Sequence, residues 1–224
     1  DVDTHDVLDL RPLSAFSVNY NNPASLTNTT TDLDRFAGYA YYTLQVADPL
    51  QLIAGLSYDY LNFPENTDYP PLSSGQDHKD QWSPKAGLIY TPGKNTVFRF
   101  AYTRSLGGLF YDNSVRLEPT QLAGFTQAYR SLVPESVVGP VPGSSFTTYG
   151  IGVDHQFPTW TYVGLYGELL QSEADRTVGA FNSTGPLFIV FPPPARATPG
   201  SMRESLDYEE RSLIFNVNQL LGQE

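Results

Sequence analysis

The sequence contains no cysteine and a single methionine. Without cysteine there is no disulfide framework, no thiol nucleophile and no thiolate metal site. Basic residues are also scarce, because 13 Lys and Arg stand against 24 Asp and Glu, which gives a formal net charge of −11. No basic stripe could neutralise the phosphates of a nucleic acid, so this balance argues against a nucleic-acid partner.

Long apolar runs are missing as well. No stretch approaches the roughly 20 apolar residues that a membrane helix needs, and this excludes a spanning helix. A transmembrane β-barrel is not excluded in this way, because only alternate residues of each strand face lipid and no long apolar run is needed. The first six residues are acidic and polar and do not form a signal peptide. The chain is therefore either processed or an internal piece of a longer protein, and we favour an internal piece.

The chain instead contains segments in which apolar and polar residues alternate, each about long enough for a tilted strand to cross a bilayer. There are eight of them, at 11–20, 35–46, 51–61, 82–91, 96–106, 146–157, 161–172 and 207–218. Tight turns alternate strictly with long loops between them. The turns are 47–50, 91–95 and 157–160, and the loops are 21–34, 62–81, 107–145 and 173–206. This pattern predicts an all-β protein, an antiparallel up-and-down transmembrane β-barrel of about eight strands in a single domain.

The two faces of each predicted strand differ in polarity. In 96–106, Phe98 and Phe100 point to one side and Arg99 points to the other. A charge facing lipid is costly, so the face with Arg99 is predicted to line the lumen. The same reasoning gives the predicted lumen-lining residues Asp59, Lys85, Arg99, Thr103 and Asp154. A soluble all-β protein is the alternative, since its strands also alternate, but it gives no reason for every second connection to be short.

Several stretches resemble known barrels. Residues 82–92 (WSPKAGLIYTP) and 96–103 (TVFRFAYT) resemble the strand, periplasmic turn and strand of TonB-dependent receptor barrels. Residues 115–120 (VRLEPT) are similar to the "L-K-P-E" segment of those receptors, with departures at Glu118 and Thr120. The block 117–136 is also similar to barrels fused behind tetratricopeptide repeats in Gram-negative outer-membrane proteins.

The resemblance spans roughly 35–172 and implies a bacterial outer-membrane barrel of transporter or receptor type. Such receptors carry a plug domain ahead of the barrel, and we expect none within 1–224. They also have more than eight strands, which favours a section of a larger barrel over a complete small one whose interior side chains fill. The expected partners are outer-membrane lipid and either the remainder of a larger barrel chain or another outer-membrane subunit.

No catalytic or metal-binding pattern stands out. The three histidines lie far apart in the sequence without metal-ligand spacing, so we expect no metal site and no cofactor. Asp1, Asp3, His5 and Asp6 could hold a divalent cation, but a solvated terminal tail is the favoured interpretation. Two of the carboxylates Glu168, Glu173 and Asp175 could in principle serve glycoside chemistry, yet carboxylates at a barrel mouth more commonly tune ion preference or bind cations. We therefore expect the chain not to be an enzyme.

The long loop 107–145 is the most distinctive connection. The spacing of Leu122, Phe125 and Tyr129 favours a short helix over 119–132. The loop could fold inward as a constriction or outward as a binding surface, but the favoured interpretation is that these three side chains hold it against the barrel wall. Its candidate binding residues are Glu118, Gln121, Phe125, Gln127, Arg130 and Glu135. A second apolar run, 188–194, ends in three prolines and suggests an added hairpin or a contact patch.

Two functions remain open. The favoured one is the wall of an outer-membrane transporter or export channel through which a solute or polymer passes. The alternative is a structural or adhesive outer-membrane protein that binds a partner or cations through long extracellular loops.

Overall fold

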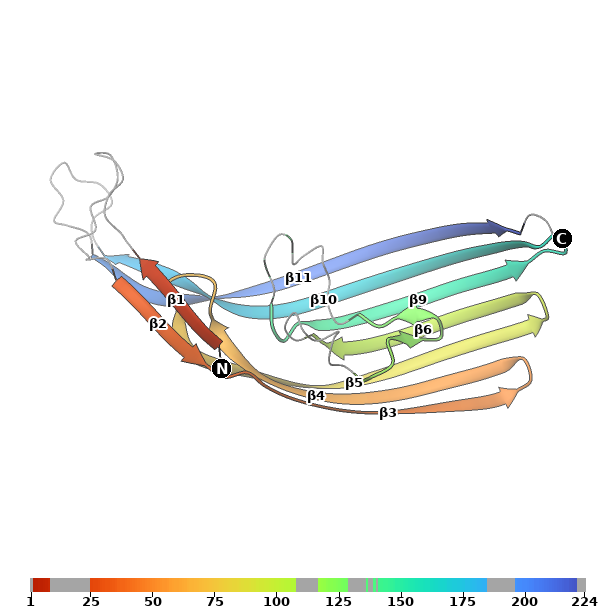
Figure 1. Ribbon diagram of the computed structural model, residues 1–224, viewed down its shortest axis with the longest axis horizontal. Helices are drawn as coiled ribbons and strands as arrows, with labels where there is room; N and C mark the ends of the chain where they lie inside the picture. Colours follow the sequence, from red (N-terminus) through yellow and green to blue (C-terminus); the bar gives the residue numbers. More distant parts are fainter. Residues whose placement is uncertain are drawn as a thin grey trace. The chain divides into compact units, whose positions relative to one another are not determined.

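The computed structural model describes residues 2–8, 25–107, 117–128, 136, 139, 141–184 and 196–220. Its main element is a seven-stranded sheet in the order β11-β10-β9-β6-β5-β4-β3, shown in Figure 1. These strands are β3 (Asp34–Ala47), β4 (Leu50–Asn66), β5 (Ser73–Gly93), β6 (Thr96–Leu106), β9 (Ser145–Gln156), β10 (Thr161–Thr184) and β11 (Arg196–Gln219). The pairs β5–β6, β6–β9 and β9–β10 are antiparallel. No helix in the described part of the chain is long and apolar enough to cross a membrane.

Two smaller antiparallel pairs accompany this sheet. β1 (Val2–Leu8) pairs with β2 (Ser25–Thr31), and β7 (Gln121–Leu122) pairs with β8 (Phe125–Thr126). The first pair overturns two expectations, because the predicted terminal tail forms β1 and the predicted loop 21–34 contains β2. Backbone hydrogen bonds hold such a pair without an apolar alternation, which is why the sequence pattern missed it.

The prediction of an all-β, antiparallel, sequentially connected sheet is confirmed. Seven of the eight predicted segments correspond to β3, β4, β5, β6, β9, β10 and β11, and the first, 11–20, lies outside the described residues. The three predicted tight turns join β3 to β4, β5 to β6 and β9 to β10, and they lie at one end of these strands (Figure 1). Short turns at a common end are typical of an up-and-down barrel.

The lengths predicted for two long loops were wrong. Most of 62–81 belongs to β4 and β5, and much of 173–206 belongs to β10 and β11. Once a strand extends beyond lipid, neither face needs to be apolar, so the alternation that marks the strand in the sequence disappears. Residues 73–81 of β5 are all polar or glycine, so they show no alternation of apolar and polar residues. The apolar run 188–194 lies outside the described residues.

The chain divides into two compact units. The first comprises Asp1–Arg35, Leu61–His78 and Asp175–Ser205. Within it, Arg176 pairs with Glu204 at 2.8 Å between Nη2 and Oε2 and donates from Nη1 to the Tyr69 hydroxyl at 2.9 Å. The backbone N–H of Gly179 donates to the Tyr69 carbonyl at 3.0 Å.

The second unit comprises Phe36–Tyr60, Lys79–Ala174 and Leu206–Glu224, and its sheet has two contrasting faces. On the apolar face the register aligns Leu88, Phe100 and Ile151, and Ile151 is 68% exposed. On the polar face it aligns Lys85 and Thr103, and Lys85 is only 3% exposed. Exposed apolar and buried polar side chains reverse the usual arrangement of a soluble protein and suit a sheet whose outer surface faces lipid.

Candidate functional site

The segment Leu117–Ala128 lies between β6 and β9 in the sequence and packs against the polar face of the sheet. We call it the inner segment. Its centre is the β7–β8 hairpin, in which Leu122 pairs with Phe125. The two turn residues, Ala123 and Gly124, have φ angles of 50° and 93°. Positive φ at both positions defines a type I′ turn, the geometry that closes a two-residue hairpin.

Apolar contacts hold one side of the hairpin against the sheet. Phe125 is 2% exposed and forms a buried cluster with Ala101 and Ala123, and the cluster packs against partly buried side chains of three further strands. These are Ile53 of β4, Ile89 of β5 and Tyr166 of β10. The inner segment thus contacts β4, β5 and β6, which are neighbours in the sheet, and also β10, which pairs with none of these three strands.

Glycines on the polar face leave the room for these contacts. A Cβ atom at Gly150 would lie 2.6 Å from Cγ of Phe125, and one at Gly152 would lie 3.3 Å from Cζ of the same ring. At Gly87 an added Cβ would lie 3.1 Å from the Cβ of Ala123. Real Cβ atoms do not approach ring carbons at 2.6 Å, so a side chain at Gly150 would displace Phe125.

The helix predicted over 119–132 is wrong for the described residues up to Ala128, which form a hairpin instead. Tyr129, the third residue of the predicted apolar stripe, lies outside the described residues. Leu122 and Phe125 share a face in either structure, because a spacing of three places residues side by side in a helix and opposite each other across a two-residue turn. The alternative in which these side chains hold the loop against the wall agrees with the observed packing of Leu122 and Phe125.

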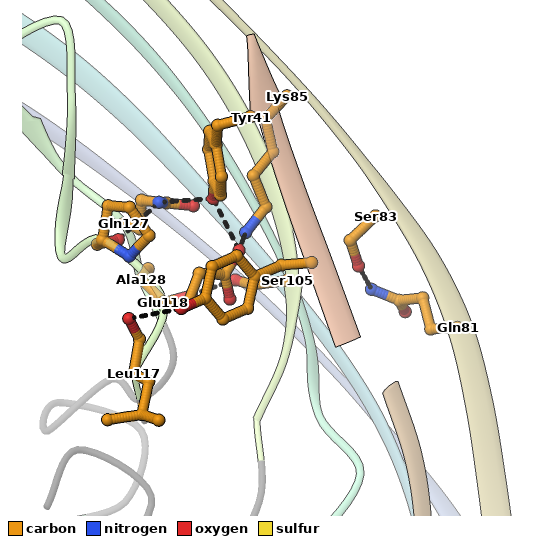
Figure 2. A network of polar contacts seen from close by, with 11 residues as sticks. Tyr41, Gln81, Ser83, Lys85, Ser105, Leu117, Glu118, Gln127 and Ala128 are labelled. Atoms are coloured by element: carbon orange, nitrogen blue, oxygen red, sulfur yellow. Dashed lines mark hydrogen bonds and ion pairs between the residues drawn. The ribbon is translucent and has the colours of Figure 1, made fainter. Parts of the chain in front are cut away.

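A buried polar network holds the other part of the inner segment, and Figure 2 shows its members around Glu118. Nζ of Lys85 forms an ion pair with Oε1 of Glu118, and their side chains are 0% and 5% exposed. The Tyr41 hydroxyl donates to the same carboxylate oxygen at 2.6 Å. Nε2 of Gln127 donates to the Tyr41 oxygen at 2.9 Å and to the Pro119 carbonyl at 2.6 Å.

Backbone groups of the inner segment are bonded to the sheet as well. The Tyr39 hydroxyl donates to the Leu117 carbonyl at 2.9 Å, and the Ser105 hydroxyl donates to the Ala128 carbonyl. Within the segment, the Gln127 N–H donates to the Thr120 carbonyl at 2.9 Å. Because buried polar groups are costly unless they are hydrogen-bonded, this set of partners specifies one position for the segment.

A second charged cluster lies beside the hairpin turn. Nε of Arg99 pairs with Oδ2 of Asp154 at 2.9 Å, and the Tyr166 hydroxyl donates to Oδ1 of Asp154. A Cβ atom at Gly124 would lie 3.0 Å from Nη1 of Arg99. The turn of the inner segment therefore reaches the Arg99–Asp154 pair. Among the described residues no group of His, Asp and Glu could hold a metal ion.

Comparison with known families places this arrangement in context. The family described as TonB dependent receptor-like, beta-barrel matches residues 2–139, which is more than half of the chain. The chain belongs to this family. No curated protein and no solved structure matches it. Membership places the chain among barrels of the bacterial outer membrane that act as transporters or receptors. Fusion to tetratricopeptide repeats stays a prediction.

The structure brings the predicted lumen-lining residues of this TonB-dependent receptor-like barrel onto one face. Lys85 and Thr103 are register partners, and Arg99 pairs with Asp154. Asp59 is 1% exposed and lies at a buried position of the alternating pattern of β4. That this face lines a lumen stays a prediction.

The loop candidates separate into two groups. Glu118, Phe125 and Gln127 are buried and hold the inner segment in place, whereas Gln121 is exposed. Arg130 and Glu135 lie outside the described residues. Sequence reasoning missed Tyr41 and the glycines of the polar face. The glycines did carry a signal, since Gly87, Gly150 and Gly152 all occupy polar-face positions of their strands.

Proposed function

We propose that the chain forms part of the wall of a passage through which a polar solute or polymer crosses the outer membrane. The observation that carries this proposal is the two-faced sheet of the second unit. Its apolar face exposes Phe100 and Ile151, while the other face carries Lys85, Arg99 and Asp154. A barrel wall with lipid outside and a wet interior requires this distribution.

The absence of native cysteine permits a direct test of the two faces. Single cysteines would be introduced as Gln121→Cys on the inner segment and Ile151→Cys on the apolar face, with the protein reconstituted in lipid vesicles. We expect a membrane-impermeant thiol reagent to modify Gln121→Cys and a lipid-soluble maleimide to modify Ile151→Cys. Equal reactivity of both variants toward the impermeant reagent would contradict the lipid-facing assignment.

Passage itself is tested by osmotic swelling of the same vesicles in uncharged sugars of increasing size. Swelling above that of protein-free vesicles, with a size cut-off, is expected for a passage. Swelling equal to that of protein-free vesicles would favour the alternative, a structural or adhesive outer-membrane protein whose extracellular loops bind a partner.

A further inference from the structure

We propose that Arg104, on the apolar face of β6, binds the phosphate of an anionic lipid headgroup in the outer leaflet of the membrane. The inference concerns the outer surface of the sheet and does not depend on passage through the interior. It requires only that the apolar face meets lipid, which the cysteine experiment described above tests separately.

Arg104 lies on the apolar face of the sheet. β6 and β9 pair without interruption along the whole of β6, so successive side chains of β6 alternate between the two faces. Ala101 and Thr103 are buried on the polar face, whereas Phe100 is exposed on the other. Arg104 therefore shares the face of Phe100. It is the only Lys, Arg, Asp or Glu that β6 or β9 places on that face.

The position of Arg104 along β6 is at the border of the expected lipid band. β6 has 11 residues, about 34 Å from its first residue to its last, and at a tilt of about 40° it crosses roughly the 25 Å height of an apolar band. Arg104 is near the end that joins the long connection to β9, whereas the tight turns lie at the opposite end (Figure 1). Because short turns of such barrels are periplasmic, Arg104 lies at the outer-leaflet border.

Aromatic side chains mark the same border on neighbouring strands. Tyr102 pairs with Tyr149 across β6 and β9, and their ring centroids lie 5.2 Å apart. The rings of Tyr58 on β4 and Trp82 on β5 lie 4.9 Å apart. Tyr and Trp gather where hydrocarbon meets headgroups, so these pairs place Arg104 at the depth of lipid phosphates.

The guanidinium of Arg104 lacks the protein partner that other cations of the sheet have. Lys85, Arg99 and Arg211 each pair with a carboxylate. Among the described residues no carboxylate pairs with Arg104, and its Nε is buried without a hydrogen-bond partner. A charge that faces lipid is costly unless the side chain extends to the headgroups. A guanidinium there can bind two phosphate oxygens through parallel hydrogen bonds.

The surroundings of Arg104 favour an anionic headgroup. Thr147 is its register partner on β9 and places a hydroxyl on the same face. On β5 the nearest carboxylate of this face is Asp80, about 14 Å along the strand from the level of Arg104. Glu173 belongs to β10, which β9 separates from β6. The charge next to Arg104 is therefore positive, and it attracts an anionic lipid more strongly than a zwitterionic one.

The test measures which lipid lies next to Trp82. Trp160→Phe removes the other tryptophan, which lies in the tight turn before β10. The protein is reconstituted in phosphatidylcholine vesicles that contain either dibrominated phosphatidic acid, a phosphomonoester lipid, or dibrominated phosphatidylcholine. Fluorescence quenching gives the association of phosphatidic acid relative to phosphatidylcholine. We expect a ratio of about five, the factor that one Arg contributes near an anionic membrane surface.

Variants on the same background locate the preference. Arg104→Gln is expected to lower the ratio to about one, and Arg104→Lys to an intermediate value, because Lys keeps the charge but cannot form the paired hydrogen bonds. Arg211→Gln is the matched control. Arg211 lies on the apolar face of β11 but is already paired with Glu209, so the ratio is expected to stay unchanged. Heat-modifiable mobility shows that each variant is folded, and Arg104→Lys keeps the test decisive if Arg104→Gln does not fold.

Three results overturn the inference: equal quenching by the two lipids in the parent protein, an undiminished ratio in both Arg104 variants, or an equal loss in Arg211→Gln. Inorganic phosphate added to the vesicles distinguishes a lipid site from a site for the free anion. We expect the ratio to persist in its presence, and a ratio of one at millimolar phosphate would also overturn the inference. None of these results bears on passage, which the swelling experiment measures.

Discussion

Two long connections of the chain were expected to be loops of the same kind, and they differ. The β4–β5 connection continues as paired strand up to Asn66 and resumes at Ser73, whereas the β6–β9 connection returns along the sheet as the inner segment. The side chain of Asn66 forms hydrogen bonds within the turn that follows it. It donates to the Tyr69 carbonyl at 2.6 Å and accepts from the Tyr69 N–H at 3.0 Å. The inner segment instead finds its partners on distant strands.

The difference shows what makes a connection fold back. A returning segment needs space on the sheet and a partner for each of its polar groups. Gly150 and Gly152 provide the space, and Lys85 and Tyr41 provide the polar partners.

The largest effect is expected from Glu118→Ala. It leaves Lys85, fully buried as a side chain, without the carboxylate that neutralises it. Removing one partner of a buried ion pair costs about 3–5 kcal/mol. The free energy of unfolding from urea titration in detergent micelles measures this loss, and a loss below about 1 kcal/mol would show that the pair does not hold the segment.

The second-largest loss of stability is expected from Gly150→Val. The new side chain would overlap the ring of Phe125 and destabilise the protein by about 1–3 kcal/mol through overpacking. Gly38→Val is the matched control, because nothing lies within 4 Å of a Cβ atom at Gly38. Both variants are compared by the same urea titration. Equal stability of the two would mean that Gly150 does not provide the space for Phe125.

Glu204→Ala in the first unit is expected to have a smaller effect. The side chains of Arg176 and Glu204 are 15% and 33% exposed, so solvent screens their attraction. A loss of up to about 1 kcal/mol is expected for a partly exposed pair. Limited proteolysis of the first unit provides the measurement. A loss as large as that of Glu118→Ala would show that partial exposure does not weaken the Arg176–Glu204 pair.

Leu117→Ser is expected to have almost no effect on stability. This side chain is 87% exposed, and the inner segment is bonded here through its backbone carbonyl to Tyr39. A change within about 0.5 kcal/mol is typical of such surface positions. The urea midpoint measures it, and a clear loss would show that Leu117 contributes to holding the segment through its side chain.

The sequence was sufficient to predict the strands within the expected membrane span. Lipid on one side of a strand and polar surroundings on the other make apolar and polar residues alternate with a period of two. Beyond that span the alternation ends, and the extensions of β5 and β10 were taken for loops. For the inner segment, an apolar spacing of three fitted a helix and a hairpin equally well. The ion pair between Lys85 and Glu118 was not predictable, since it joins residues 33 positions apart in the sequence through a hairpin whose position depends on glycines of other strands.

The position of the inner segment also has a consequence for the order of assembly. The segment precedes β9 and β10 in the chain, yet it packs against Gly150 and Gly152 of β9 and against Tyr166 of β10. We expect it to remain undocked until those strands have paired, while the β5–β6 hairpin can form earlier through its tight turn. Burial of Phe125 would then be a late event that reports the completed registration of β4, β5, β6, β9 and β10.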